Sequence, residues 1–598
     1  LVHREEFGEL ISIFELQSVE GFDLEIIEKL RPFIFVGKEV GHSTYTFRDL
    51  FSDGKHEIAT RYSRTVENQH GYIDTSEKGF LGSGYQLMNR YNYRFGTRLS
   101  IGMTTEKDAG EELFKGSQPL GFDFYSAHLY YTGDRRLKTF AIGDYNLQIG
   151  QGLTFWSSFG FGKTADVMNI ARQGRGILPF RSANESGYLR GSAFTYQSGH
   201  FTLTCFGSTK MLDANFNVDT LSPEDAHISA LLLSGYHRNE AELSDKHTVR
   251  ESLGGAEVKY SAGRLRLGFS TVYGGYSKPL ADPQRLYDKF GLAGSSFLNA
   301  GVHYSWLYEN AYFFGESAVS GNKGLATING MLISLHKLLD AAIVYRNYSK
   351  YYQAPYGRAF GESTANSNEK GVYFALSYAF APHWKLGAYV DIFSFPWLRY
   401  RVDAPSQGYE YLADIQYDQS KKFSLVLRYR FQSKPLNLNE GQPLHAQHHA
   451  ARQSARVHLQ YKVNASVRLR TRIELSDYVH NTVNEKGFLG YQDIAYNPLG
   501  KPYDFTFRYT LFDVDSYNAR IYAFENDMPY TFSIPFFNDE GARWYVLAQY
   551  RFSRGLSAWV RISRTSLWQS KTIGSGLSLI NAPHRTDVKV MLRYNFRK

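Results

Sequence analysis

One long glycine-rich stretch, Gln151 to Gly187, holds the residues best suited to bind a solute. The stretch holds Arg172, Arg175, Arg181 and Glu185, and Arg190 follows at the start of the next strand. Guanidinium groups that line a pore attract anions. If the stretch folded into the interior of a channel, these side chains would form a constriction that favours anions. Packed on neighbouring loops, they would form a surface, and in either case Glu185 and Arg190 are candidates to pair.

The apolar residues of the same stretch indicate that part of it is sheltered from water. Four aromatic side chains would be poorly placed in a solvated loop: Phe155, Trp156, Phe159 and Phe161. Packing inside a lumen would remove them from water. The sequence therefore supports two arrangements of residues 151–187 equally, an inward-folded plug or constriction and a surface loop packed on its neighbours.

No complete metal-binding or catalytic motif is visible. Two clusters contain metal-ligating residue types: His445, His448 and His449, and Asp108, Glu111 and Glu112. The histidines lack a nearby acid or Cys to complete a tetrahedral set, and the acids lack the fixed spacing of a Ca²⁺ loop. Neither Gly-x-Ser-x-Gly nor His-Glu-x-x-His occurs, and Gly162-Lys163-Thr164 lacks the upstream glycine of a phosphate loop. We therefore predict no metal, no cofactor and no enzymatic activity.

The first 36 or so residues differ from the rest because their apolar residues have helical spacing. These residues fall into two groups: Leu10, Ile13, Phe14 and Leu16, then Leu24, Ile26, Ile27 and Leu30. Asp23 is placed to cap the second helix, and Pro32 to end it. A helix, a hairpin containing Gly and a second helix resemble the helix-hairpin-helix module.

In DNA-binding members of that family the hairpin has the form Gly-hydrophobic-Gly and offers backbone N–H groups to a phosphate. Here the hairpin is Gly21-Phe22-Asp23, so an acidic side chain replaces the second glycine. Lys29 and Arg31 would assist an anion, although solvated charges at a helix end are the usual case. Two interpretations stay open: contact with nucleic acid, or packing beneath the remainder of the chain or against a periplasmic protein.

The elements that must position these residues are strands. Aromatic residues make up 16% of the 598 residues, with 45 Tyr and 43 Phe against 17 Pro. Aromatic side chains favour strands and membrane interfaces. No run approaches the roughly 20 apolar residues of a transmembrane helix. A β-barrel escapes that test because only alternate residues meet lipid.

Alternation of apolar and polar residues supports this interpretation. The clearest apolar faces are Val588, Val590, Leu592, Tyr594 and Phe596; Phe423, Leu425, Leu427, Tyr429 and Phe431; and Val467, Leu469, Ile473 and Leu475. Between them stand polar residues, with Met591 as an exception. These runs hold the roughly 9 to 11 residues of a tilted membrane strand. We predict an all-β membrane protein, a large closed antiparallel transmembrane β-barrel.

The connections alternate between tight turns, which we place in the periplasm, and long polar loops such as Lys210 to His247, which we place at the cell surface. The predicted tight turns lie near residues 133–136, 198–200, 261–264, 381–383, 418–421 and 553–555. A first count gives about 25 strands, which is odd. Splitting Tyr517 to Glu540 into two strands gives about 26, and 24 is the alternative. Either size is too wide for wall side chains to fill, so the lumen must be open or plugged.

The predicted organisation is a helix-hairpin-helix module at residues 1–38, a linker at 39–55 and a barrel at 56–598. The chain resembles Bacteroidota proteins in which helix-hairpin-helix repeats precede a large outer-membrane barrel. The stretches that carry this resemblance include residues 5–21, 106–111, 143–145, 150–153, 189–191, 522–527 and 573–576. The start at Leu1, without Met or a signal-peptide pattern, leads us to expect a processed or truncated N-terminus.

These features favour an outer-membrane channel or transport component with a periplasmic N-terminus. Its small module would gate the lumen or recruit a protein partner. The barrel itself would contact outer-membrane lipid and lipopolysaccharide. Two alternatives are a DNA-binding protein for DNA uptake and a non-conducting structural subunit of an outer-membrane complex.

Overall fold

The structure is a computed structural model. It describes residues 13–19, 22–30, 46, 48–74, 76, 78–160, 162–219, 222–420, 422–438 and 446–597. The chain divides into two compact units, Leu1–Gly54 and Lys55–Lys598. None of the helices in these described ranges is long and apolar enough to cross a membrane.

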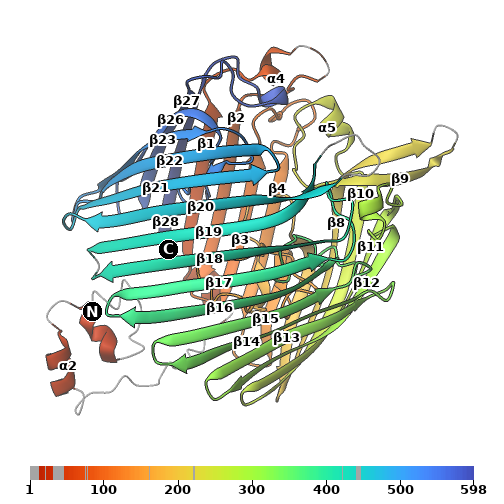
Figure 1. Cartoon of the computed structure of the whole chain (residues 1–598), viewed down its shortest axis with the longest axis horizontal. Coiled ribbons are helices and arrows are strands. Elements are labelled where there is room, and N and C mark those ends of the chain that lie inside the picture. The colour runs from red at the N-terminus through yellow and green to blue at the C-terminus, as the bar shows by residue number, and fades with distance from the viewer. Residues whose placement is uncertain are drawn as a thin grey trace. The chain divides into compact units, whose positions relative to one another are not determined.

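The second unit is a closed wall of 24 antiparallel strands. Each wall strand pairs with the next one along the chain, and β1 pairs with β28 to complete the circle (Figure 1). The wall strands are β1 (Lys55–Thr65), β2 (Tyr85–Phe95), β3 (Leu99–Lys107), β4 (Phe124–Thr132), β5 (Leu137–Gln148), β7 (Leu189–Ser198), β8 (Phe201–Asp219), β10 (Val249–Ala262), β11 (Leu265–Leu280), β12 (Gly294–Tyr308), β13 (Ala311–Ser320), β14 (Leu325–His336), β15 (Leu339–Tyr348), β16 (Glu369–Ala381), β17 (Trp384–Phe395), β18 (Ser406–Gln419), β19 (Phe423–Asn437), β20 (Gln447–Lys462), β21 (Val467–His480), β22 (Val483–Tyr496), β23 (Tyr503–Val514), β26 (Asp539–Arg551), β27 (Leu556–Leu567) and β28 (His584–Arg597).

Shorter elements lie in the connections between wall strands. β6 (Gly176–Pro179) adds to β5, and β9 (Ser222–Leu232) extends β8 as a hairpin. A separate two-stranded sheet consists of β24 (Ile521–Tyr522) and β25 (Phe536–Phe537). The remaining helical turns are α4 (His70–Ile73), α5 (Glu240–Ser244), η2 (Leu286–Asp288) and η3 (Gly576–Ser578).

The strand count corrects the prediction of about 26 strands and agrees with the alternative of 24. The two extra strands predicted within Tyr517 to Glu540 are not part of the wall. Instead, β23 pairs directly with β26, and the residues between them leave the wall and contain β24 and β25. Alternating apolar residues also suit a short hairpin, so the pattern alone did not separate the two cases.

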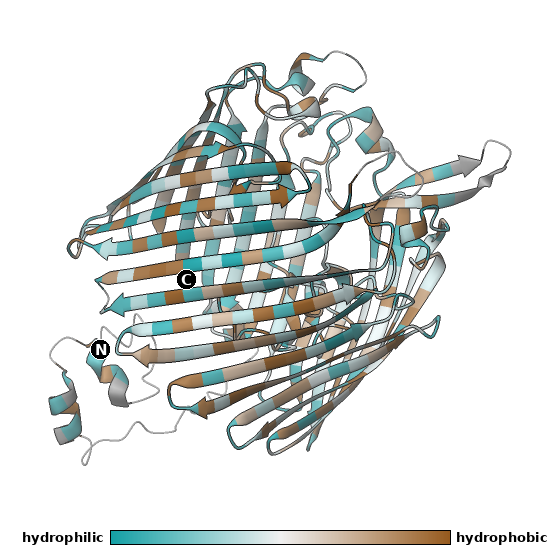
Figure 2. Ribbon diagram, viewed as in Figure 1, coloured by the Kyte–Doolittle hydropathy of each residue, from teal (hydrophilic) through white to brown (hydrophobic). Residues whose placement is uncertain are grey.

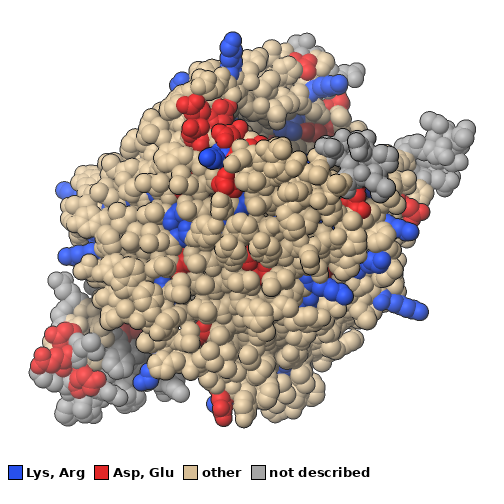
Figure 3. All heavy atoms as spheres, in the orientation of Figure 1, with Lys and Arg blue, Asp and Glu red and all other residues tan. Residues whose placement is uncertain are grey.

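The predicted alternation is confirmed. On β28 the outward residues Leu592 and Tyr594 are 52% and 47% exposed, whereas Met591 between them is fully buried. Figure 2 shows hydrophobic and hydrophilic residues alternating along the strands. In Figure 3 the visible face is mostly uncharged, and charged side chains project mainly from its margins. An apolar outer face on a closed barrel is the surface that lipid requires.

The two rims of the barrel differ as predicted. The tight links near residues 133–136, 198–200, 261–264, 381–383, 418–421 and 553–555 all lie at one rim, which we call the turn rim. The opposite loop rim carries the long connections, although 321–324 and 481–482 are also short there. One predicted loop, Lys210 to His247, instead contains the end of β8, all of β9 and α5.

The first unit contains η1 (Ile13–Ser18), α2 (Leu24–Leu30) and α3 (Asp49–Ser52). The Ile26 backbone N–H donates to the Asp23 carboxylate at 2.8 Å, so Asp23 caps α2. Ile27 is fully buried. Gly21, Arg31 and the side chain of Lys29 lie outside the described residues.

Candidate functional site

The first residues of the segment Gln151–Gly187 bind a carboxylate of the barrel wall. Glu316 of β13 is buried and accepts hydrogen bonds from the backbone N–H groups of Gln151 (2.6 Å) and Thr154 (2.7 Å). Gly150 and Gly152 have φ of +53° and +84°, and a Cβ on Gly150 would lie 2.7 Å from a Glu316 oxygen. Glycine is needed for this turn, which directs backbone N–H groups at an anion. The segment is therefore anchored on the inner face of the wall.

Apolar residues of the segment pack against the same inner face. Leu153, Val167 and Ile170 are buried with wall residues of β13 to β18. The hydroxyl groups of Tyr352 and Tyr373 donate to the backbone carbonyls of Leu153 (3.0 Å) and Val167 (2.9 Å). The segment is thus packed inside the barrel.

The four aromatic residues singled out in the sequence differ in their surroundings. Phe155 is fully buried against Phe206 and Tyr356, and Trp156 is 6% exposed. Phe159 is 77% exposed, so the expectation that it is sheltered is wrong. Phe161 lies outside the described residues.

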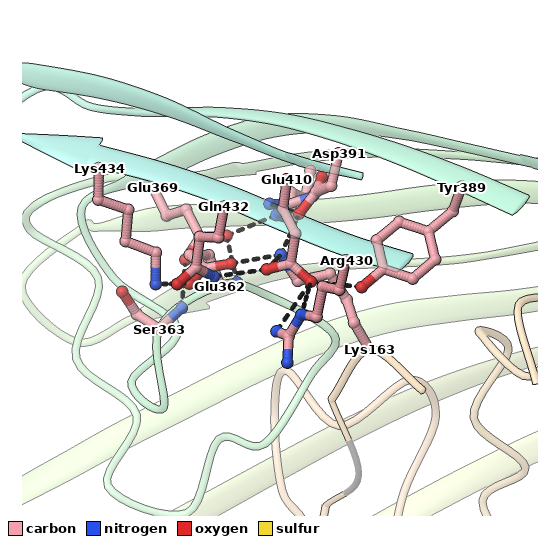
Figure 4. Close-up of polar contacts among 11 residues, drawn as sticks. Lys163, Glu362, Ser363, Glu369, Tyr389, Asp391, Glu410, Arg430, Gln432 and Lys434 are labelled. Atoms are coloured by element: carbon pink, nitrogen blue, oxygen red, sulfur yellow. Dashed lines mark hydrogen bonds and ion pairs between the residues drawn. The ribbon is translucent and has the colours of Figure 1, made fainter. Parts of the chain in front are cut away.

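Lys163 lies at the tip of the segment within a group of buried carboxylates (Figure 4). Its ammonium is 3.0 Å from both Asp391 of β17 and Glu410 of β18, and it also contacts Glu362. Burial by itself lowers the pKa of Lys163, but these three carboxylates outweigh it and raise the pKa above its ordinary value. The Lys163 charge therefore holds the segment tip against the wall.

Further charged groups surround this contact. Arg346 of β15 is fully buried and donates to Asp391 at 2.7 and 3.0 Å and to Glu369. Arg430 of β19 reaches Glu410 at 2.8 Å, and Lys434 contacts Glu362. We call Lys163 with Glu362, Asp391 and Glu410 the lysine hub. Sequence reasoning did not identify it, because its members are separated by about 200 residues or more from Lys163.

The predicted constriction arginines occupy separate places along the segment. Arg172 lies over the Trp156 ring at 5.3 Å. Arg175 donates to Gln148 at 3.1 Å, and Arg181 donates to Ser100 of β3 at 3.0 Å. They do not form one ring of charge.

Arg190 pairs with Asp144 of β5 at 2.7 Å, so the suggested pairing of Arg190 with Glu185 is wrong. The two groups meet because Asp144 and Arg190 are register partners on β5 and β7. Glu185 instead lies near the loop rim.

A second cluster at the loop rim contains metal-ligating residue types. The His237 ring nitrogens lie 2.6 Å from Asp123 and 2.9 Å from Asp213, and the His237 backbone N–H donates to Glu111 at 3.0 Å. Ligand atoms of Glu111, Asp123 and His237 lie within 4.8 Å of one another, and we call these three residues the rim triad. Although burial lowers it, hydrogen bonds to the two aspartates raise the pKa of His237 to about 10.

A second inward segment, residues 515–538, was not predicted. Its backbone carbonyls at Tyr522 and Phe524 accept hydrogen bonds from Arg472 of β21 (2.8 Å) and Arg508 of β23 (2.6 Å). Met528 is buried with Ala59, Trp559 and Met591. The one apolar residue on the polar face of β28, Met591, was therefore a sequence signal for this contact.

Carboxylates of this second segment pair with cations of the wall. Glu525 accepts two hydrogen bonds from Arg543 of β26, at 2.7 and 3.0 Å, and also contacts Arg561 of β27. Asp527 accepts one from Lys589 of β28 at 2.6 Å. Bidentate contacts of this kind are strong and directional.

The inner wall has two halves of different charge. β10 to β18 carry mainly carboxylates: Glu251, Glu257, Glu316, Glu369, Asp391 and Glu410, with Arg346 among them. β20 to β28 carry mainly arginines: Arg452, Arg456, Arg472, Arg508, Arg543 and Arg561, with Glu474 and Asp493 among them. At the border, on β19, the side chains of Arg428 and Arg430 are 21% and 47% exposed, and Arg456 is 25% exposed. These arginines face inward, since the adjacent residues Leu427, Tyr429 and Val457 face outward. Solvent therefore reaches this part of the lumen.

Comparisons with known proteins give a distant likeness to solved structures. No protein-family model and no curated protein sequence matches the chain. Solved structures that align with it include the siderophore receptor PirA from Acinetobacter baumannii (9% identity, 92% of this chain and 81% of that one, TM-score 0.43). Others are the ferric citrate transporter FecA (9%, 91% and 79%, 0.42) and the copper transporter OprC (10%, 91% and 81%, 0.41). All three TM-scores lie below 0.5.

The fold itself defines the class of protein. A closed antiparallel barrel with an apolar outer face and a polar interior is the architecture of outer-membrane proteins. The chain is an outer-membrane β-barrel protein. The helix-hairpin-helix resemblance and the relation to Bacteroidota proteins stay predictions.

Proposed function

We propose that the chain is a transport barrel whose lumen is restricted by the inward segment Gln151–Gly187. The observation that carries this proposal is the exposure of Arg430 beside the lysine hub. Solvent reaches a charged wall next to the segment, so the segment narrows the lumen without filling it. Charged side chains that line a hydrated path are the feature by which pores select ions.

The preferred solutes of this path are anions. Arg428 and Arg456 line its exposed part, and each also pairs with a carboxylate, Asp414 or Glu474. Arginine keeps its charge in any such environment, and its remaining N–H groups can contact a passing anion. The predicted constriction residues Arg172, Arg175 and Arg181 add positive charge on the segment itself.

The N-terminal module is part of the same proposal. We place the turn rim and the N-terminus in the periplasm, where the helix-hairpin-helix module gates the lumen or recruits a periplasmic partner. DNA uptake receives less support. The Asp23 carboxylate already accepts the Ile26 N–H, and that amide is one that a phosphate at the start of α2 would use.

Planar-bilayer conductance tests the transport proposal. The purified chain should show small, anion-selective conductance steps. Replacing residues 158–173 with a short Gly-Ser linker should increase the step size several-fold, because the tip of the segment is removed while the Glu316 anchor remains. Replacing residues 568–578 at the loop rim with the same linker is the matched control and should leave the steps unchanged.

Two outcomes would favour the alternatives. Silence of both the intact chain and the 158–173 replacement would reject transport and favour a non-conducting structural subunit. Salt-sensitive retention of duplex DNA by the full chain, reduced in Lys29→Gln and Arg31→Gln variants, would favour DNA uptake.

A further inference from the structure

The rim triad has a composition and geometry that the transport proposal does not use. Glu111 and His237 are 1% and 2% exposed, and the Asp123 side chain is 1% exposed. Glu111 and Asp123 belong to the connection between β3 and β4, whereas His237 belongs to the connection between β9 and β10. The imidazole and the two carboxylates thus meet at one buried point from two connections, and Asp213 and Lys246 pair with them there.

The imidazole of His237 is oriented as in many metal sites. Its Nε2 lies 2.9 Å from Asp213 of β8, while Nδ1 lies 2.6 Å from Asp123. In many metal sites, one ring nitrogen of a histidine binds the ion and the other donates its N–H to a carboxylate. That hydrogen bond fixes the orientation of the ring and of the ligating nitrogen. Asp213 fills that orienting role here, and an ion at Nδ1 would take the place of the proton shared with Asp123.

The oxygens of the triad leave room for an additional cation. Lys246 binds the Asp123 oxygen Oδ1 at 2.6 Å, which leaves Oδ2 toward His237. A tetrahedral ion with bonds of about 2.1 Å holds its ligand atoms roughly 3.4 Å apart. The triad atoms, all within 4.8 Å, would move inward by about 1 Å or less to reach that spacing.

An independent observation comes from Glu185. Within the residues that the structure describes, its carboxyl makes no hydrogen bond or ion pair. It lies against Gly235, two residues before His237, where a Cβ would be 2.5 Å from its oxygen. The Glu185 carboxyl lines the same cavity as Asp123, so it can serve as a third oxygen ligand beside the His237 nitrogen.

A cavity opens beside the cluster. Its volume is about 580 Å³, and its lining includes Asp123, Glu185 and Asp213 together with Trp156 and Tyr188. An ion could therefore enter from the loop rim without unfolding the wall.

We propose that Glu111, Asp123 and His237 bind one divalent transition-metal ion, with Glu185 as a further ligand and Asp213 as the orienting carboxylate. The mixed nitrogen and oxygen ligands suit Zn²⁺ and exclude a preference for Ca²⁺, which selects oxygen alone. The ion would join two loop-rim connections to the end of the inward segment. This site is separate from the transport path, so either proposal can fail without the other.

Zn²⁺ itself is the probe. The detergent-purified full chain, stripped with a chelator, should bind one equivalent in calorimetry and retain it through gel filtration. His237→Gln and Glu111→Gln should each weaken binding at least a hundredfold, and Asp213→Asn roughly tenfold because it only orients the ring. His336→Gln, an exposed histidine at the turn rim, is the matched control and should bind as the parent chain does.

A spectroscopic measurement distinguishes loss of the metal site from misfolding of the variant. Co²⁺ at the site should give the absorption of a four-coordinate ion with one imidazole, and that band should vanish in His237→Gln while the barrel keeps its heat-modifiable mobility in gels. No stoichiometric binding, equal binding in His237→Gln, or a preference for Ca²⁺ over Zn²⁺ would each overturn the proposal.

Discussion

The two inward segments meet the wall with opposite charges. Gln151–Gly187 brings the cation Lys163 to carboxylates of β17 and β18, while 515–538 brings Glu525 and Asp527 to cations of β26, β27 and β28. Each segment therefore lies beside the half of the wall whose charged side chains have the opposite sign. A buried ion pair contributes little net stability but costs about 3–5 kcal/mol when one partner is removed.

This difference shows that charge sorts the segments within the barrel. Both segments also pack apolar residues, yet apolar contacts are not selective for one wall over the other. Charge complementarity excludes the exchanged arrangement, because it would place like charges together without water. The following changes should therefore affect one segment at a time.

The largest effect is expected for Lys163→Glu. A fourth carboxylate in the lysine hub should release the first segment, and a cost of about 3–5 kcal/mol corresponds to roughly a hundredfold to thousandfold more opening. Hydrogen exchange of the amides at residues 151–175 measures it. Lys323→Glu, at an exposed position of the loop rim, is the control. Unchanged protection at residues 151–175, or equal loss at 519–537, would contradict the charge-sorting comparison.

Glu525→Gln should loosen the second segment by a smaller amount. The amide keeps the shape of the side chain but leaves Arg543 and Arg561 without their carboxylate, at a cost of about 3 kcal/mol. Exchange at residues 519–537 should rise roughly a hundredfold, and that at 151–175 should stay constant. Glu540→Gln, whose carboxylate accepts a hydrogen bond from Gln569 at 3.0 Å, serves as the control. Loosening of both segments would show that they are not held independently.

A moderate effect is expected on ion selectivity. Combining Arg428→Gln with Arg456→Gln should lower the anion-to-cation permeability ratio by roughly twofold to fivefold, because charged pore linings set selectivity. Reversal potentials in a salt gradient give this ratio. Arg554→Gln, at the turn rim, should leave it unaltered. A ratio that stays constant in the double variant would place the conducting path elsewhere in the lumen.

The smallest effect is expected in the first unit. Asp23→Ala removes the cap of α2 and should destabilise that helix by about 1 kcal/mol. Exchange at residues 26–30 should increase several-fold, while the conductance of the barrel stays the same. Asp23→Asn, which retains the capping oxygen, should behave like the parent. A change in conductance would link this helix directly to the lumen.

The sequence predicted features that depend on neighbours in the chain. Alternation at Leu592 and Tyr594 identified the lipid face. Short runs of glycine and polar residues identified the tight turns between strands. Local patterns could not distinguish wall strands from the hairpin of β24 and β25, because Tyr522 and Phe536 suit either. Met591 is an apolar residue on the polar face of its strand, but its partner Met528 is 63 residues away along the chain.

By itself, the sequence determined the barrel, its two rims and the polar interior, since a period of two and a turn are properties of a few adjacent residues. Only the tertiary structure decided the strand number, the second inward segment, the lysine hub and the rim triad. Those features depend on charges brought together from positions far apart in the chain. The closure of the barrel determines which of these charged residues come into contact, and local sequence patterns contain no information about those contacts.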